Sequence, residues 1–226
     1  MTLTFEDLLA RARSLPRDGR RAVLGIAGSP GSGKTTLAER LVRELNGAGE
    51  PWVAHVQMDG FHLADAELER LGRRDRKGAP DTFDAAGYAA LLRRLHEDAD
   101  DGTVYAPGFE RVLEQPIAGA VPVQPTARLV VTEGNYLLLD TGAWARVRPQ
   151  LDEVWFCEPD ESERLRRLIA RHEEFGKSHD EAVAWVRRSD QPNAELVAMT
   201  RDRADLLVPV TALPAPHEPP SARAGA

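Results

Sequence analysis

The sequence GSPGSGKT, Gly28 to Thr35, has the residue types and spacing of a phosphate-binding loop. It matches the pattern G-x-x-x-x-G-K-[ST], and it lies between an apolar run typical of a strand and a pattern typical of a helix. Glycines let the backbone close around an anion, and the N–H groups that open the next helix favour negative charge. Lys34 can neutralise the β and γ phosphate oxygens of a nucleoside triphosphate, and the Thr35 hydroxyl can ligate Mg²⁺. The expected phosphate contacts are Gly28, Ser29, Pro30, Gly31, Ser32, Gly33, Lys34, Thr35 and Thr36.

Two acidic residues end or follow predicted strands at the same edge of the sheet as this loop. Asp59, in HVQMDGFHL, stands where a carboxylate can orient a substrate hydroxyl and accept its proton during phosphoryl transfer. Glu133, in VVTEGNYLLLD, stands where a carboxylate near Thr35 suits direct or water-mediated Mg²⁺ binding, and Asp59 is a further candidate metal ligand. The alternatives are a plain Asp-Gly turn for Asp59 and a surface residue at a strand end for Glu133.

A basic helical segment, ERLRRLIARHEEFGKS, is a candidate lid. Arg167 and Arg171 form an i,i+4 pair on one helix face, and like charges at that spacing repel each other. A transferring phosphoryl group would compensate them, which makes both arginines candidate catalytic residues. The alternative is a solvated basic face paired with neighbouring glutamates. Gly176 suits either a hinge or a plain helix C-cap.

The elements that must position these residues alternate between strands and helices. This alternation predicts an α/β fold with a mostly parallel sheet, helices on both faces and ligand loops at the carboxyl ends of the strands. Together with the glycine-rich loop it indicates a P-loop nucleoside triphosphate hydrolase fold with a helical lid. We expect residues 1–19 to form a helix that packs on the core, 20–212 the main domain, and 213–226, a proline-rich tail, to be disordered. The predicted strands are 21–28, 52–58, 127–133, 151–159 and 205–210, and the predicted helices are 5–15, 34–45, 63–71, 85–95, 160–175, 178–188 and 193–203.

Composition excludes several functional classes. The chain has 226 residues and a net charge of −7, which argues against a general affinity for nucleic acid. It contains no apolar run near the ~18 residues that a membrane helix needs, and its first residues lack the features of a secretory signal, so we expect a cytoplasmic protein without a membrane partner.

The single cysteine, Cys157, lies in an apolar run and is expected to be a buried structural thiol. A homodimer is left open, because no stretch demonstrates an interface.

Beyond the individual residues, the chain resembles the phosphoribulokinase/uridine kinase superfamily of P-loop kinases, most closely its bacterial pantothenate-kinase-like and fructose-transport-kinase-like members. The resemblance covers roughly Arg21 to Val210. It implies ATP and Mg²⁺ as cofactors and transfer of the γ-phosphoryl group to the hydroxyl of a small molecule. The motifs that carry it, in the order seen in that superfamily, are GSPGSGKTT, MDGFH, RKGAPDTFD, YAPGFERVLEQP, TEGNYLLLD and RRSDQPNAELV.

The resemblance also implies roles for individual residues. Asp59 matches the catalytic base, Lys34 and Thr35 the phosphate and magnesium ligands, and Glu133 the acidic residue after the third strand. Arg167 and Arg171 match the lid arginines of similar kinases. Residues matching the acceptor side, each with a local loop-stabilising role as the alternative, are Phe61, His62, Lys77, Asp81, Phe83, Glu110 and Arg111.

One departure from the family bears on the acceptor. Uridine kinases carry a Tyr and a Thr-His-Thr-Arg type segment where this chain has FERVLEQP, so a sugar or a pantothenate-like alcohol ranks ahead of a nucleoside.

Two other functions remain open at this point. One is a regulatory protein that binds ATP, hydrolyses it slowly and signals to a protein partner through the lid. The other is an RNA-processing kinase, which the acidic balance of the chain disfavours.

Overall fold

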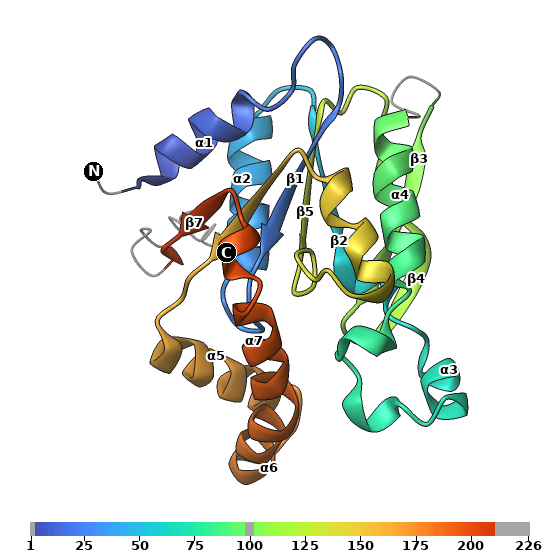
Figure 1. Cartoon of the computed structure of the whole chain (residues 1–226), viewed down its shortest axis with the longest axis vertical. Helices are drawn as coiled ribbons and strands as arrows, with labels where there is room; N and C mark the ends of the chain where they lie inside the picture. Colours follow the sequence, from blue (N-terminus) through green and yellow to red (C-terminus); the bar gives the residue numbers. More distant parts are fainter. Residues whose placement is uncertain (1–2, 98–101, 211–226) are drawn as a thin grey trace, which may run out of the picture.

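Six consecutive buried residues, AVLGIA, form the central strand of the protein. In the computed structural model, which describes residues 3–97 and 102–210, this strand belongs to a five-stranded sheet of order β2-β5-β1-β6-β7 (Figure 1). Each neighbouring pair in the sheet is parallel, as the alternation of strands and helices predicts. The strands are β1 (Ala22–Ala27), β2 (Val53–Gln57), β5 (Leu129–Gly134), β6 (Glu153–Cys157) and β7 (Leu206–Val208).

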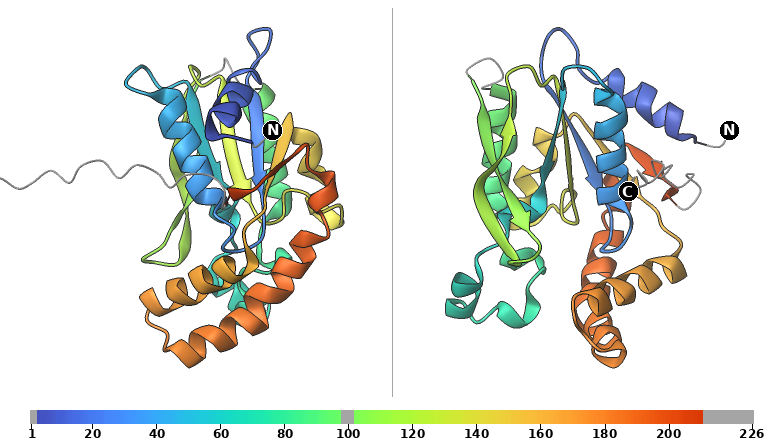
Figure 2. Two further views of the ribbon diagram at one scale, coloured as in Figure 1. Left: turned by 90° about the vertical axis from the view of Figure 1, so that its left-hand side faces the viewer. Right: turned by 180° about the vertical axis from the view of Figure 1, so that it is seen from behind.

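Helices cover both faces of this sheet and bury a separate apolar cluster on each (Figures 1 and 2). On one face, α2 packs Leu37, Leu41 and Leu45, spaced one helical turn apart, against the strands, and the N-terminal helix α1 adds Leu8 to the same cluster. On the other face, α4 and two short 3₁₀ turns enclose the second cluster. The predicted α/β architecture is therefore confirmed. The covering elements are α1 (Phe5–Arg13), α2 (Lys34–Asn46), α4 (Ala85–Glu97), η4 (Gly142–Arg146) and η5 (Arg148–Gln150).

A second, antiparallel sheet of two strands was missed by the sequence analysis. Its strands carry Pro107, Pro116 and Pro122, and proline normally argues against a strand because it cannot donate to the ladder. Both strands of a two-stranded ribbon are edges, so each proline can occupy a position that needs no donor. This ribbon packs beside the segment that carries Asp59. The elements on this side are η1 (Met58–Phe61), α3 (Asp65–Arg70), η2 (Arg74–Arg76), η3 (Pro80–Thr82), β3 (Val104–Glu110) and β4 (Gln115–Val123).

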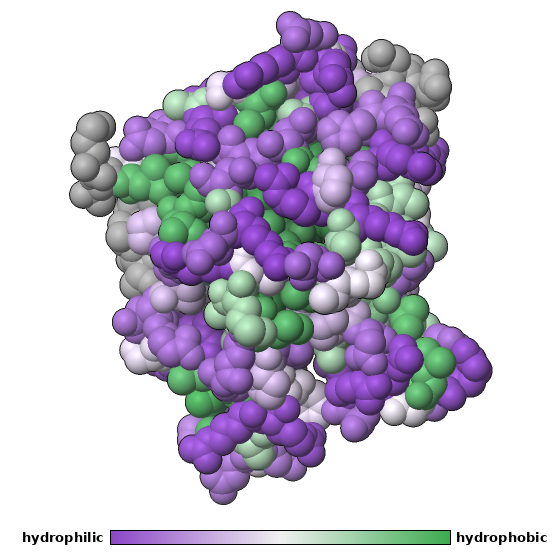
Figure 3. Space-filling view, viewed as in Figure 1, coloured by the Kyte–Doolittle hydropathy of each residue, from purple (hydrophilic) through white to green (hydrophobic). Residues whose placement is uncertain are grey.

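The predicted lid is a helical arm that begins after β6. The sequence predicts a break between residues 188 and 193, but a π-helical turn joins the two helices there without interruption. The arm and the α3 segment form two lobes at the end of the molecule beyond the carboxyl ends of the strands, with a notch between them (Figures 1 and 3). The elements of the arm are α5 (Glu161–Glu174), α6 (His179–Trp185), the π-helix η6 (Val186–Asp190), α7 (Gln191–Ala198) and η7 (Arg201–Arg203). The tail predicted to be disordered, 213–226, lies outside the described residues.

The register of the strands determines where along the sheet the candidate functional side chains lie. Glu133 of β5 lies opposite Ile26 of β1 and Gln57 of β2. The phosphate loop starts two residues after Ile26, and Asp59 follows Gln57 by two residues. The sheet therefore delivers the loop, Asp59 and Glu133 to one edge.

The neutral form of His55, on β2, makes the stability of the fold dependent on pH. Burial lowers the pKa of His55 to about 4, and its buried Nε2 has no hydrogen-bond partner in the described part of the chain. In the unfolded chain the pKa of this histidine is the ordinary value near 6.5. Below about pH 6.5 the unfolded state therefore binds more protons than the native state. We expect acidification from pH 7 to pH 5 to lower the free energy of unfolding by about 2 kcal/mol through His55 alone.

Urea denaturation at the two pH values tests this expectation. The His55→Gln variant cannot take up the proton, so it should show the smaller loss. An equal loss in both proteins would contradict the assignment.

Candidate active site

The phosphate loop connects β1 to α2 and takes a backbone path that glycine favours. Gly31 and Gly33 have φ values of 77° and 85°, in the left-handed region. A Cβ on Gly31 would lie 2.7 Å from Cγ of Leu168, so the loop packs closely against α5. Gly33 is the N-cap of α2 and provides no side-chain hydrogen bond to it. The N–H groups of the first turn are therefore left for an anion.

Two polar groups inside the loop lack the partners that a phosphate would supply. Lys34 Nζ lies 3.5 Å from the Ser29 carbonyl oxygen and has no carboxylate within 4.0 Å in the described residues. Ser32 Oγ is buried without a hydrogen-bond partner, 2.5 Å from where a Cβ on Gly28 would stand. Buried polar groups are normally paired, so this cradle fits the triphosphate of a nucleotide.

Glu133 links the loop to the neighbouring strand. Its side chain is buried, and Oε1 accepts a hydrogen bond of 3.1 Å from the Thr35 hydroxyl. Burial raises the pKa of the Glu133 carboxyl to about 7; the charge of Lys34 lowers it, that of Asp59 raises it, and that of Arg111 lowers it. These three charged groups, from three separate segments, therefore lie within electrostatic reach of one carboxylate.

The same residues suit Mg²⁺. Within residues 3–97 and 102–210, no cluster of three or more His, Cys, Asp and Glu side chains could hold a metal alone. Mg²⁺ in phosphoryl-transfer sites takes one or two carboxylates and completes its shell with phosphate oxygens and water. Thr35 and Glu133, joined by a hydrogen bond beside the phosphate loop, have the oxygen groups that such a partial shell needs, and Asp59 stays a further candidate.

Asp59 lies on η1, a short 3₁₀ turn held firmly in place. A Cβ on Gly60 would lie 2.3 Å from the Pro107 carbonyl oxygen, so η1 is pressed against β3. The backbone carbonyl of Asp59 accepts hydrogen bonds from the His62 N–H at 3.1 Å and from His62 Nδ1 at 2.8 Å. Its half-buried carboxylate has no hydrogen bond or ion pair with the described residues. Asp59 therefore has a fixed backbone and a carboxylate whose oxygens form no hydrogen bond with the described residues.

Aromatic rings cluster around His62, three residues after Asp59. The His62 ring lies 3.9 Å from the Phe83 ring and 4.9 Å from the Phe109 ring, and Phe61 lies 5.1 Å from Tyr88, centroid to centroid. Burial lowers the pKa of His62, which favours the neutral ring. The structure therefore brings Phe61, His62 and Phe83 together beside Asp59, with Phe83 buried in the core.

The charged residues predicted on the acceptor side differ in their surroundings. Lys77 Nζ forms an ion pair of 2.7 Å with Asp65, and Asp81 forms one of 2.8 Å with Arg76. Both contacts fit the alternative of loop stabilisation. Arg111 is half-buried and has no hydrogen bond or ion pair with any described residue, although it lies close enough to lower the pKa of Glu133. Of these three charges, Arg111 is the one left for a ligand.

Two side chains not recognised from the sequence hold the segment 78–80 onto the core. The Tyr136 hydroxyl donates to the Gly78 carbonyl oxygen, and Trp144 Nε1 donates to the Pro80 carbonyl oxygen at 3.1 Å. Both aromatic residues follow β5 in the sequence. Their donors could not be paired with these carbonyls before the tertiary structure was known.

The two predicted lid arginines have different environments. Arg167 shares Glu163 with Arg166, with N–O distances of 2.9 and 2.7 Å, and one Arg167 terminal nitrogen lies 3.7 Å from where a Cβ on Gly33 would stand. Arg167 therefore reaches the phosphate loop. Arg171 is exposed and has no ion pair with the described residues.

Arg164, which the sequence analysis left without a role, ties the lid to the phosphate loop. It is 1% exposed. Its guanidinium donates to the Pro30 carbonyl oxygen at 3.1 Å, to Gln191 Oε1 at 2.6 Å, and to both oxygens of Glu161 at 2.6 and 2.7 Å. One buried side chain thus joins the loop, the start of α5 and the start of α7.

Comparison with known proteins agrees with this geometry. The model of the Phosphoribulokinase / Uridine kinase family matches residues 23–214. The chain belongs to this family. A Schizosaccharomyces pombe (strain 972) relative named "Putative uridine kinase C227.14" is 31% identical over 91% of this chain and 90% of its own length. "Uncharacterized protein YggC" of Escherichia coli (strain K12) is 35% identical over 85% of this chain and 79% of its own.

A solved structure shows the same fold. The crystal structure titled as a "putative fructose transport system kinase" from Silicibacter sp. TM1040 has a TM-score of 0.82 and 37% identity, covering 92% of this chain and 100% of that one. The family membership makes this protein a P-loop kinase that phosphorylates a small molecule. In the described residues, the helices are too short or too polar to cross a bilayer.

Proposed function

We propose that this kinase transfers the γ-phosphoryl group of ATP to the hydroxyl of a small molecule, with a sugar or a pantothenate-like alcohol ahead of a nucleoside. The observation that carries the proposal is the Asp59 carboxylate, which has no partner in the described residues and stands at the same sheet edge as the phosphate loop and Glu133. An acceptor-free nucleotide switch would not need a carboxylate held in this position.

The residues take the following roles in the proposed reaction. The acceptor oxygen forms a bond to the γ phosphorus as the bond to the β-phosphate oxygen breaks, and the hydroxyl proton passes to Asp59. Lys34 and Arg167 offset the negative charge on the phosphoryl oxygens, and Arg171 would join them when the lid closes. Thr35 and Glu133 would hold Mg²⁺, which would neutralise part of the charge on the phosphate oxygens. Phe61, His62, Phe83 and Arg111 face the acceptor.

The test is turnover of ATP by the purified protein with Mg²⁺ against a panel of pantothenate, fructose and other sugars, ribonucleosides and phosphorylated sugars. Both ADP and the new phosphoester are measured. We expect one acceptor to raise ADP release above the acceptor-free rate, with one phosphoester formed per ADP. Slow hydrolysis that no acceptor changes would overturn the proposal and favour the regulatory switch.

A further inference from the structure

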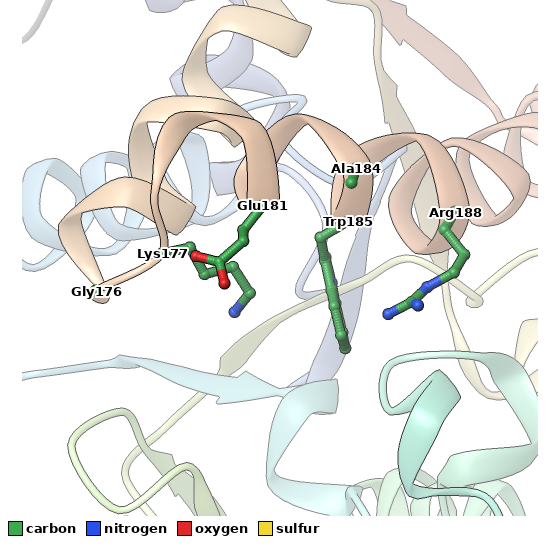
Figure 4. A pocket seen from close by; sticks show the side chains of 6 residues that line it. All are labelled: Gly176, Lys177, Glu181, Ala184, Trp185 and Arg188. Atoms are coloured by element: carbon green, nitrogen blue, oxygen red, sulfur yellow. The ribbon is translucent and has the colours of Figure 1, made fainter.

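The lid carries a pocket of about 420 Å³ that the proposed reaction leaves without a role (Figure 4). It lies where α5 turns into α6 and continues along α6 to the π-helical turn η6. Trp185 is half-exposed and forms part of the pocket wall. The lining residues are Gly176, Lys177, Glu181, Ala184, Trp185 and Arg188.

Two cations flank the indole ring of Trp185. Lys177 Nζ lies 4.9 Å and Arg188 Cζ 5.2 Å from the ring centroid. Neither cation has a carboxylate within 4.0 Å in residues 3–97 and 102–210. Contact with an aromatic face orients both cations without neutralising them.

The pocket contains one acidic residue, and that residue is already engaged. Glu181 Oε2 accepts hydrogen bonds from Ser178 N–H at 2.9 Å and from Ser178 Oγ at 2.7 Å, which completes the cap of α6. The Ser178 hydrogen bonds are also the main reason that the pKa of Glu181 is lowered, with Lys177 a weaker cause. The pocket therefore keeps a positive charge that an anion would complement.

The helix that carries this pocket faces the acceptor side. Lys177, Trp185 and Arg188 point away from the lid helices, toward the side on which β2 and η1 lie in Figure 4. Asp190, at the end of η6, and Asp59, on η1, both raise the pKa of Tyr136, so both lobes lie within electrostatic reach of one side chain. π-Helical turns often mark functional sites, and this one carries Arg188.

We propose that Lys177 and Arg188, set against Trp185, bind an anionic group of the phosphoryl acceptor, so that the substrate class of this kinase is an alcohol carrying a carboxylate or a phosphate ester. This inference rests on the proposed function and narrows it. Arg111, in the turn between β3 and β4, forms no ion pair with the described residues and provides a third cation. An anion held from both sides draws the lid toward the sheet edge, and its binding energy helps to position the hydroxyl.

The first test uses acceptor pairs that differ in the anionic group: D-glycerate and glycerol, pantothenate and pantothenol, ribose 5-phosphate and ribose. We expect the anionic member of one pair to be the better substrate. The double variant Lys177→Ala/Arg188→Ala should raise its KM by about 10- to 100-fold, the loss expected for one or two hydrogen bonds from charged groups, and leave the KM for ATP unchanged. Arg187→Ala removes a neighbouring exposed charge outside the pocket and should change neither.

The possible failures separate the two proposals. Two results would overturn this inference and leave the kinase proposal standing. One is equal turnover of the neutral and the anionic member of each pair. The other is a double variant in which the KM for ATP rises together with the KM for the acceptor. If no acceptor is phosphorylated, the proposed function fails. In that case, titration with inorganic phosphate, monitored by tryptophan fluorescence, tests whether the pocket binds an anion. A fluorescence change that is lost in the double variant and kept in Arg187→Ala supports an anion site. The absence of any change rejects it.

Discussion

Replacing Asp59 with asparagine should lower the rate of phosphoryl transfer about a thousandfold and leave ATP binding nearly unchanged. General-base catalysis contributes about 10²- to 10⁴-fold, and asparagine keeps the shape of the side chain while losing the capacity to accept a proton. The carboxylate has no hydrogen bond or ion pair in the described residues, so its replacement breaks no contact that holds η1 in place. The measurement is kcat with the acceptor found in the panel, alongside ATP affinity from equilibrium titration.

The matched control is Asp75→Asn, the same chemical change at an exposed position of the same lobe. It should leave kcat and ATP affinity as they are. A turnover number for Asp59→Asn close to that of the native protein would remove Asp59 from the role of base.

Arg164→Ala should lower the free energy of unfolding by about 3 kcal/mol and weaken ATP binding. The substitution leaves the Pro30 carbonyl and Gln191 without their buried donor and opens space under the phosphate loop. Glu161 is 60% exposed, so it regains water and does not add the full penalty of a buried unpaired charge. Urea denaturation measures the stability, and equilibrium titration measures the affinity for ATP.

Arg166→Ala provides the comparison on the same helix. Arg166 pairs with Glu163 at the same i,i+3 spacing but is 69% exposed, so its removal should lower stability by no more than about 1 kcal/mol. Arg164→Lys keeps the charge and loses the planar fork, and should recover only part of the ATP affinity. Equal effects of Arg164→Ala and Arg166→Ala on ATP binding would show that Arg164 does not position the loop.

The sequence predicted features that depend on neighbouring residues. The phosphate loop, the strands β1, β2, β5 and β6, and the helix starting at Lys34 follow from glycine positions and apolar runs within short segments. The sequence also predicted that Asp59 and Glu133 lie at one edge of the sheet, because parallel strands bring their carboxyl ends together. The β3–β4 ribbon was missed because its prolines argue against strands in any local view, and the π-helical turn was missed because Pro192 reads as a helix break.

The sequence by itself therefore determined that Gly28–Thr35 forms a phosphate-loop motif between a strand and a helix, because the necessary glycines and side chains are contiguous there. Only the tertiary structure decided which charges are neutralised and which are left for ligands. Arg164 and Pro30 are 134 positions apart, and their hydrogen bond depends on how α5 packs against the loop. Likewise, Lys77 and Asp81 form ion pairs, whereas Arg111, Lys177 and Arg188 form none with the described residues. Ion pairs and hydrogen bonds depend on distances in the folded protein, and the order of residues along the chain does not specify those distances.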